Sequence, residues 1–276
     1  MNRPADYHIH TFFSEDSDES PDNIIAKAIS LNLKCICFTD HNDYDWPVID
    51  GKKEFSLDYP SYTKYMEKLK FKYKDIFPVY IGVEQGLSQT SADLINNYDQ
   101  DNFLDFIIGS SHLVYGADPY EKDFWTGRDI DKSIRDYYES IIENLMVCNN
   151  FDVYGHLDYI TRYIPDKTYK YDPNKYMEII EVILKKLIEK GKGIELNTAG
   201  LKCQLNAANP DTPVLKLYKQ LGGEIITVGS DAHKADDVGK FHDKAYTLLK
   251  EAGFNYYTIF KERHPEFIPL WFYTTF

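Results

Sequence analysis

The 276-residue sequence is poor in cysteine, in basic residues and in long apolar runs. Its four cysteines are Cys35, Cys37, Cys148 and Cys203. Their spacing matches neither a zinc knuckle nor a disulfide framework, which favours a reducing compartment. The 31 Lys and Arg residues against 44 Asp and Glu residues give a net charge of −13, which repels nucleic acid and anionic membranes. No uncharged apolar run approaches the ~20 residues that span a bilayer, and no apolar signal segment follows the first residues. We therefore expect a cytoplasmic protein that acts on small molecules; its oligomeric state stays open.

The sequence also lacks the glycine-rich loops that bind nucleotide phosphates. Neither G-x-G-x-x-G nor a Walker loop occurs, and no Gly/Ser linker, low-complexity segment or fixed-length repeat divides the chain. The hydrophobic content of 43 % suffices for one sizeable core. These features predict a single domain over residues 1–276.

Segments rich in β-branched, aromatic or cysteine residues alternate with stretches of helical periodicity. The predicted strands are Asp6–His10, Lys34–His41, Pro78–Gln85, Leu104–His112, Asp152–His156, Gly193–Asn197 and Glu224–Ser230. The predicted helices are Pro21–Leu31, Tyr62–Asp75, Lys132–Cys148, Asn174–Lys190 and Thr212–Leu221. This alternation is typical of α/β proteins with a parallel sheet, and seven units predict a seven-stranded (β/α) barrel related to the TIM barrel. The aromatic segment Phe254–Phe276 is expected to cap or complete the barrel.

Most of the eight histidines lie at or just beyond the carboxyl end of a predicted strand. Six do so: His8, His10, His41, His112, His156 and His233. Active-site groups of parallel α/β proteins gather at this edge of the sheet. His8 and His10 project from the same face and can bind one ion, while Glu84, at the end of an apolar strand, would be costly unless paired or bound to a metal. The pattern predicts a metal centre, and leaves His242 and His264 with ordinary surface roles.

The order of these residues resembles the PHP family, named for polymerase and histidinol phosphatase. The resemblance extends from Tyr7 to about His233, through H-I-H-T, T-D-H, Glu84, S-S-H, G-H-L-D and S-D-A-H in that order. It implies a distorted seven-stranded barrel that holds three divalent metal ions. The ligands that it implies are His8, His10, Asp16, His41, Glu84, His112, His156, Asp231 and His233.

The resemblance also divides these ligands among three metals. One metal is expected to bind His8, His10, Glu84 and Asp231; a second shares Glu84 and adds His112 and His156; a third binds Asp16, His41 and His233. Imidazoles combined with carboxylates suit zinc, iron or manganese better than calcium or magnesium. Such a centre would present a cationic pocket to a phosphate in an otherwise acidic protein.

The segments Gly155–Tyr163 and Glu195–Lys202 resemble the stand-alone histidinol-phosphate phosphatase branch of this family. This implies hydrolysis of histidinol phosphate in histidine biosynthesis. Because divalent ions make hydroxide available near neutral pH, we expect a hydroxide that bridges two metals to attack phosphorus. Asp231, His233 and Arg162 are the predicted catalytic residues, and Arg162 and Lys202 are predicted to bind the substrate. Lys202 stands where the branch commonly has arginine, whose planar fork grips phosphate better than a compact ammonium does.

The motifs leave other functions open. The metal ligands alone do not distinguish histidinol phosphate from a nucleotide, a sugar phosphate or phosphotyrosine, although the charge of −13 weakens a proofreading-nuclease interpretation. A non-catalytic metal-binding module would carry the same ligands without turnover. The predicted partner is a small-molecule phosphate monoester, with no nucleic acid and no membrane. Four aromatic or acidic loop residues could face its organic part and stay outside the predicted site: Asp43, Tyr115, Trp125 and Tyr163.

Overall fold

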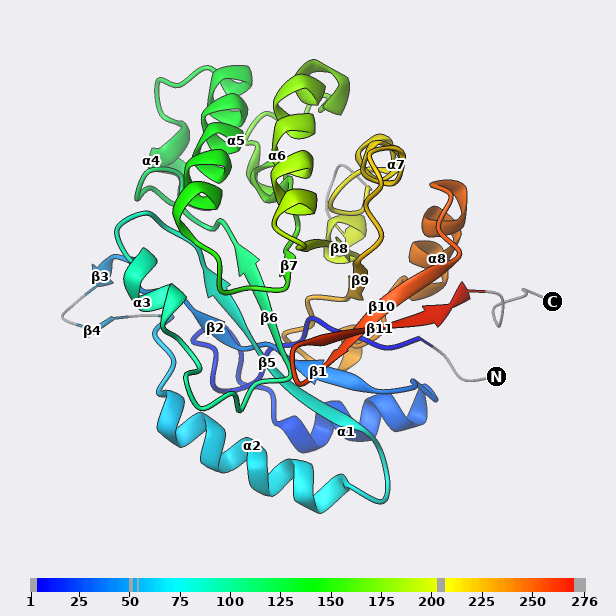
Figure 1. Ribbon diagram of the computed structural model, residues 1–276. Helices are drawn as coiled ribbons and strands as arrows, with labels where there is room; N and C mark the ends of the chain where they lie inside the picture. The colour runs from blue at the N-terminus through cyan, green and yellow to red at the C-terminus, as the bar shows by residue number, and fades with distance from the viewer. Residues whose placement is uncertain (1–3, 50–51, 54, 203–206, 271–276) are drawn as a thin grey trace.

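The computed structural model describes residues 4–49, 52–53, 55–202 and 207–270, in which parallel strands curl into a barrel with helices outside (Figure 1). Neighbouring strands follow the order β1 (Ile36–Phe38), β5 (Val79–Gly86), β6 (Phe106–Ser110), β7 (Val153–Tyr154), β8 (Gly193–Asn197) and β9 (Ile226–Gly229), and β2 (His41–Asn42) also pairs with β5. All these pairs are parallel. The sheet has seven strands, and the predicted distorted barrel is confirmed.

Residues 6–10 connect the two ends of this sheet without forming a regular strand. The backbone N–H of Asp6 donates to the carbonyl of Cys35, before β1, and that of Tyr7 donates to the carbonyl of Val228, in β9. Because the hydrogen bonds alternate between two neighbours, neither ladder is continuous. The predicted strand Asp6–His10 is therefore an extended segment that closes the barrel.

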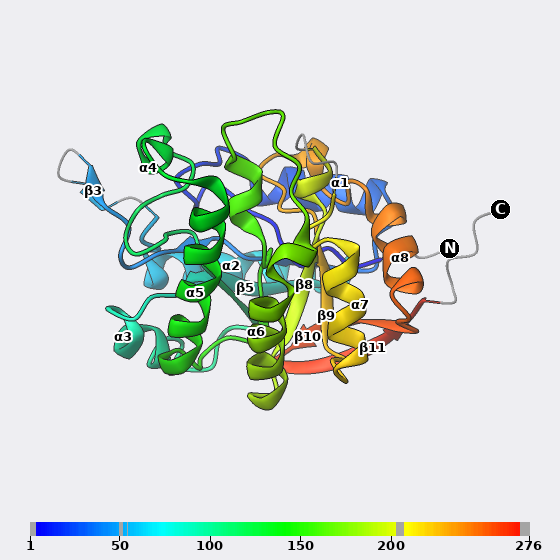
Figure 2. The same ribbon diagram turned by 90° about the horizontal axis from the view of Figure 1, so that it is seen from above.

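The helices surround the sheet, and α5, α6, α7 and α8 follow one another along one side of it (Figure 2). Ser20 caps the first helix because its side chain accepts a hydrogen bond from the N–H of Asn23, as its place before Pro21 predicts. Five of the helices were predicted, whereas α3, α4 and α8 were not. The helices are α1 (Pro21–Ser30), α2 (Tyr59–Tyr73), α3 (Ala92–Asn96), α4 (Lys122–Trp125), α5 (Ile130–Val147), α6 (Met177–Glu189), α7 (Thr212–Gln220) and α8 (His242–Glu251).

A C-terminal hairpin of β10 (Tyr256–Lys261) and β11 (His264–Pro269) packs against the amino ends of the strands. Arg263 Nε donates to Asp152, just before β7, at 2.6 Å, and the N–H of Ile226, the first residue of β9, donates to Thr258 Oγ1 at 3.1 Å. This confirms that the segment caps the barrel as far as residue 270; residues 271–276 lie outside the described part. A second hairpin consists of β3 (Val48–Ile49) and β4 (Lys52–Lys53).

His242, which the sequence placed at the surface, is buried, and this prediction was wrong. It is the first residue of α8, and its Nε2 lies 3.8 Å from the Oδ2 of Asp6. The same Oδ2 accepts a hydrogen bond from the N–H of Gly239, which draws the start of α8 towards the barrel. His264 is exposed, as expected.

No helix in the described ranges has both the length and the apolar character needed to cross a lipid bilayer. Cys35, Cys37 and Cys148 are buried free thiols, while Cys203 falls outside the described residues. The described cysteines therefore pack as small apolar side chains.

Candidate metal centre

The carboxyl ends of the strands bring the predicted ligands into one cluster around Glu84 of β5. Its Oε2 lies 3.1 Å from His8 Nε2 and 3.1 Å from His41 Nδ1. Its Oε1 lies 3.1 Å from His112 Nε2 and 2.8 Å from His156 Nε2. One carboxylate thus faces four imidazoles that come from four different parts of the chain.

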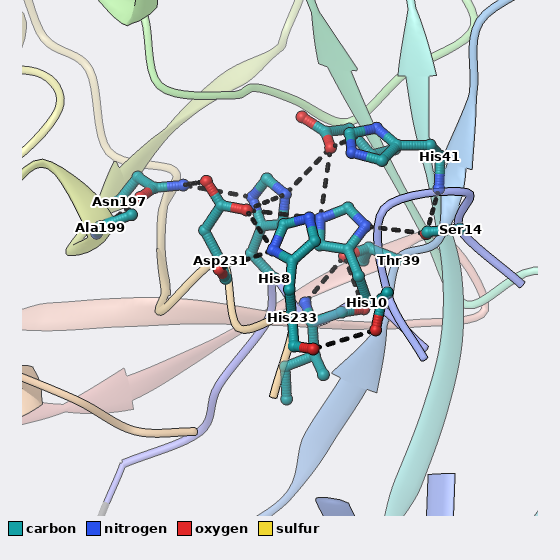
Figure 3. A network of polar contacts seen from close by, with 12 residues as sticks. His8, His10, Ser14, Thr39, His41, Asn197, Ala199, Asp231 and His233 are labelled. Atoms are coloured by element: carbon teal, nitrogen blue, oxygen red, sulfur yellow. Dashed lines mark hydrogen bonds and ion pairs between the residues drawn. The ribbon is translucent and has the colours of Figure 1, made fainter. Parts of the chain in front are cut away.

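Asp231 and His233, which follow β9, lie beside His8 and His10 (Figure 3). The Oδ1 of Asp231 is 3.4 Å from His10 Nε2, and His233 Nε2 is 3.0 Å from the Oδ2 of Asp16. The ring of His10 stacks on those of His41 and His233, with centroids 4.2 Å and 4.1 Å away. Asp16, with 41 % of its side chain exposed, marks the solvent side of the cluster.

The donor atoms form small groups whose members all lie within 4.8 Å of one another. Two of these groups, His8–His10–Glu84 and Glu84–His112–His156, fall within the first and second predicted ligand sets. A third joins His10 to His41 and His233 of the predicted third set. All nine predicted ligand residues are therefore brought together at one edge of the barrel.

The cluster leaves several buried polar atoms without a hydrogen-bond partner. They include His8 Nε2, His10 Nε2, His41 Nδ1, Glu84 Oε2 and His233 Nε2. A buried donor or acceptor without a partner costs about 1–3 kcal/mol, and divalent cations would remove that cost because imidazole nitrogen and carboxylate oxygen are their usual ligands. These residues fit divalent metal ions.

Burial and the neighbouring charges leave His10 and Glu84 in the protonation states that bind metals. Burial, with the nearby His233 and His41, lowers the pKa of His10 to about 3, so that its imidazole is neutral. Burial alone would raise the pKa of Glu84, but the neighbouring His8 and His112 hold it well below its ordinary value of 4.5. A neutral imidazole and an ionised carboxylate are the forms that coordinate a cation.

Two carboxylates contact the imidazole nitrogens that point away from Glu84. Glu195 Oε1 lies 2.6 Å from His8 Nδ1, and Asp43 Oδ1 lies 2.9 Å from His112 Nδ1. From the sequence, Asp43 is a candidate contact for the substrate, but in the structure its carboxylate contacts His112, a predicted metal ligand. Glu195 was missed, although a carboxylate within an apolar strand is the signal that singled out Glu84. Such carboxylates orient metal-binding histidines.

Arg162 lies in the 3₁₀ helix η1 (Tyr159–Tyr163), beside the cluster. Its Nη1 donates to Asp231 Oδ2 at 2.8 Å, its Nε to Asn209 Oδ1 at 2.9 Å and its Nη2 to Asn197 Oδ1 at 2.9 Å. No local pattern singled out the two asparagines, because their role depends on where the fold places Arg162. The guanidinium is thereby fixed next to a predicted metal ligand.

Lys202, in η3 (Ala199–Lys202), pairs with Asp237 of η4 (Ala235–Asp237), with Nζ 3.0 Å from Oδ2. Arg162 contacts Asp231, a predicted metal ligand, whereas Lys202 contacts Asp237, which is outside the cluster. The part of Lys202 in substrate binding stays a prediction.

A cavity of about 490 Å³ opens next to the cluster. Its lining combines three predicted ligands with aromatic and acidic side chains: Asp16, His41, Trp46, Pro47, Phe55, His112, Asp118, Tyr120, Glu121, Tyr159 and Tyr163. A small molecule in this cavity would reach the cluster and an aromatic, acidic wall at the same time.

A parallel (β/α) barrel with a histidine and carboxylate cluster at the carboxyl ends of its strands defines a metal-binding enzyme of the TIM-barrel-like class. The model of the PHP domain matches residues 6–199, and the chain belongs to the PHP family.

Known relatives agree with this assignment. The histidinol-phosphatase of Lactococcus lactis subsp. lactis (strain IL1403) is 34 % identical over 256 residues, which are 92 % of this chain and 93 % of that protein. The crystal structure of histidinol phosphate phosphatase from the same organism, complexed with zinc, L-histidinol and phosphate, has a TM-score of 0.88 at 31 % identity and covers 96 % of this chain and 100 % of that chain. A Listeria monocytogenes structure, with a TM-score of 0.74 at 19 % identity, covers 87 % and 99 % and shares the fold.

Proposed function

We propose that this chain is a histidinol-phosphatase, which hydrolyses L-histidinol phosphate to L-histidinol and inorganic phosphate in histidine biosynthesis. The observation that carries the proposal is the cluster of imidazoles around Glu84, at the edge where barrel enzymes act. The identity of 34 % with the Lactococcus enzyme supports this substrate. Residues 1–276 would act as one catalytic domain.

The proposed ligands are the nine residues predicted from the sequence, and three divalent ions are the proposed number. Zinc is supported by the metal in the Lactococcus structure, and the donor set also suits iron or manganese. When bound, such ions stabilise charge on phosphate oxygens and lower the pKa of water towards ~7, which makes a nucleophile available near neutral pH.

Arg162 is proposed to bind the phosphate of the substrate. A guanidinium has five N–H donors, and Asn197, Asn209 and Asp231 each accept from a different nitrogen of Arg162, so Nη1 and Nη2 each retain an N–H. These donors can bond phosphate oxygens and spread the charge that develops during phosphoryl transfer.

Asp231 or His233 is proposed to supply the proton that the leaving alcohol needs, with a metal-bound water as the alternative. The Nδ1 of His233 lies 3.1 Å from the backbone carbonyl of Asp231, and 28 % of the His233 side chain is exposed, so a substrate can approach it. We expect no covalent nucleophile, because Ser110, next to the cluster, donates its hydroxyl to Glu84 at 2.6 Å and has no histidine to activate it.

The cavity beside the cluster is proposed to take the imidazole and the amine of the substrate. Tyr159 and Tyr163 offer aromatic faces, and Asp118 and Glu121 offer negative charge. Aromatic faces and carboxylates are the groups that bind organic cations. This lining suits histidinol phosphate better than a sugar phosphate, which carries neither positive charge nor an aromatic ring.

A substrate panel tests the proposal. Phosphate release is measured with added manganese or zinc from histidinol phosphate, an aryl phosphate, a nucleotide and a sugar phosphate. We expect kcat/KM to be at least about 100-fold higher for histidinol phosphate, which corresponds to roughly 2.7 kcal/mol of transition-state binding. Equal values would reject this substrate, and no release from any of the four would favour a non-catalytic metal-binding module.

A further inference from the structure

Glu195 is a buried carboxylate that belongs to none of the proposed ligand sets. It lies in β8 between Ile194 and Leu196, and only 1 % of it is exposed. Its two oxygens face two different proposed ligands: Oε1 is 2.6 Å from His8 Nδ1, and Oε2 accepts a hydrogen bond from the backbone N–H of His156 at 2.9 Å. One side chain therefore contacts ligands from two separate parts of the chain.

The contact with His8 selects one tautomer of its imidazole. A neutral histidine carries its proton on one ring nitrogen and a lone pair on the other. Because the carboxylate of Glu195 accepts from Nδ1, the lone pair is left on Nε2, which lies 3.1 Å from Glu84 and has no hydrogen-bond partner. His8 is thus oriented with its metal-binding nitrogen towards the cluster.

The contact with His156 holds an unusual backbone conformation. His156 has a φ of +20°, outside the regions that residues other than glycine ordinarily adopt. Its N–H is fixed by Oε2 of Glu195 while its Nε2 lies 2.8 Å from Glu84. Such conformations persist where surrounding contacts hold them, and this hydrogen bond ties the backbone of His156 to β8.

A close approach of β9 is also needed for this arrangement. A methyl group on Gly229 would collide with Cβ of His8 and with Oε1 of Glu195. The residue at this position must therefore lack a side chain for His8 and Glu195 to meet.

We propose that Glu195 is a positioning residue that fixes His8 and His156 together and thereby sets the metal affinity of the centre. Asn197 assists, because its Nδ2 donates to Oε2 of Glu195 at 3.1 Å. The proposal rests on the metal centre of the proposed function, but not on the identity of the substrate. Residues that orient metal ligands in this way typically contribute about 10- to 100-fold to metal affinity.

The test compares Glu195→Gln with the unaltered protein. Glutamine keeps the size of the side chain, but its amide nitrogen is a donor and cannot accept from His8 or from His156, so one of the two contacts is lost. Metal-free protein is titrated with zinc or manganese against a competing chelator. We expect about 10- to 100-fold weaker binding of at least one ion. Activity is expected to return as the metal concentration rises, with KM for the substrate unchanged.

Two further variants keep the proposal testable if Glu195→Gln folds poorly. Gly229→Ala retains the carboxylate but disturbs its contact with His8, because the added methyl group collides with both side chains, and it should weaken metal binding as well. Asp152→Asn is the matched control, because this buried carboxylate lies at the opposite end of the barrel and bonds Ile107 and Arg263. Its metal affinity should equal that of the unaltered protein.

Wild-type metal affinity in a folded Glu195→Gln protein would overturn the proposal. Equal losses in Glu195→Gln and Asp152→Asn would also overturn it, since the effect would then be one of general stability. If the unaltered protein binds no divalent metal, the proposed function itself fails, and the two outcomes are thereby distinguished.

Discussion

Arg162 and Asp231 form an ion pair in which Nη1 donates to Oδ2 at 2.8 Å. Because both side chains are largely buried, the guanidinium keeps one position beside the metal cluster instead of sampling many. A cation fixed in this way can meet a phosphate without a further loss of side-chain entropy.

Arg162→Ala should therefore weaken substrate binding. Loss of a charge-assisted hydrogen bond costs about 1.5–3 kcal/mol, so KM for histidinol phosphate should rise roughly 10- to 100-fold. Arg162→Lys should recover only part of this, because lysine lacks the planar fork. Steady-state kinetics at saturating metal measure the change. An unaltered KM in the alanine variant would show that Arg162 does not bind phosphate.

Removal of a proposed ligand should abolish turnover while the barrel stays folded. We expect kcat to fall more than about 100-fold in His156→Ala and in Asp231→Ala, beyond the range for residues that only orient ligands. Phosphate release and circular dichroism check activity and folding. His264→Ala removes an exposed histidine outside the cluster and should change neither. Turnover retained in either ligand variant would contradict the assigned roles.

Chelation should remove both activity and stability. Ions bound only by the folded protein stabilise it by about 4 kcal/mol per site at a concentration 1,000-fold above Kd. For a chain of this size, each kcal/mol shifts Tm by roughly 2–4 °C, so the loss of one ion should lower Tm by about 8–16 °C and the loss of all three by more. Zinc or manganese should restore both properties. Elemental analysis that finds two ions instead of three would correct the proposed number.

Lys202 and Lys240 offer a matched pair for testing the role of Lys202. Both contact Asp237, Lys202 at Oδ2 and Lys240 at Oδ1. Lys202→Ala should raise KM by about 2- to 5-fold, as expected for a partly exposed cation worth up to ~1 kcal/mol, whereas Lys240→Ala should leave KM unchanged. Identical KM values in both variants would exclude Lys202 from substrate binding.

Asp131, on the first turn of α5, gives a pH-dependent contribution to stability. Hydrogen bonds from the hydroxyls of Tyr169 and Tyr176 hold the pKa of this carboxylate at about 2, below its ordinary value of 3.8. Because the folded state favours the ionised form, the contribution is complete above about pH 5 and is lost as the pH falls towards 2.

Asp131→Asn should consequently lower the free energy of unfolding by about 0.5–1 kcal/mol at pH 7, a value reduced by solvent exposure. Urea unfolding should give the same difference at pH 5, and roughly half of it at pH 3. A difference that grows towards acidic pH would contradict the assigned hydrogen bonds.

Much of the barrel could be predicted because buried parallel strands and amphipathic helices have strong local patterns. The predicted strand Gly193–Asn197 matches β8 residue for residue. The segment Asp6–His10 has the composition of a strand, but its hydrogen bonds are shared between two neighbours that are distant in sequence. The burial of His242 likewise depends on Asp6, more than 230 residues away, and no local pattern reports such a contact.

The part of the site that could be predicted is the set of histidines, because several of them share the same position relative to a strand. The imidazoles could be recognised together because most follow a strand, whereas Glu195 is a single acid whose partners are set by the register of β8 against β7 and β9. Asn197 and Asn209 depend on Arg162 for their role. The role of an isolated polar residue can be recognised only in the folded structure, where its partners are known.

The β10–β11 hairpin has a practical consequence for engineering. It packs against the amino ends of the strands through Arg263 and Thr258, while the candidate metal ligands gather at the carboxyl ends. Substitutions that make the hairpin more rigid can therefore raise heat tolerance without trading away catalytic speed, because the two properties depend on opposite rims of the same barrel.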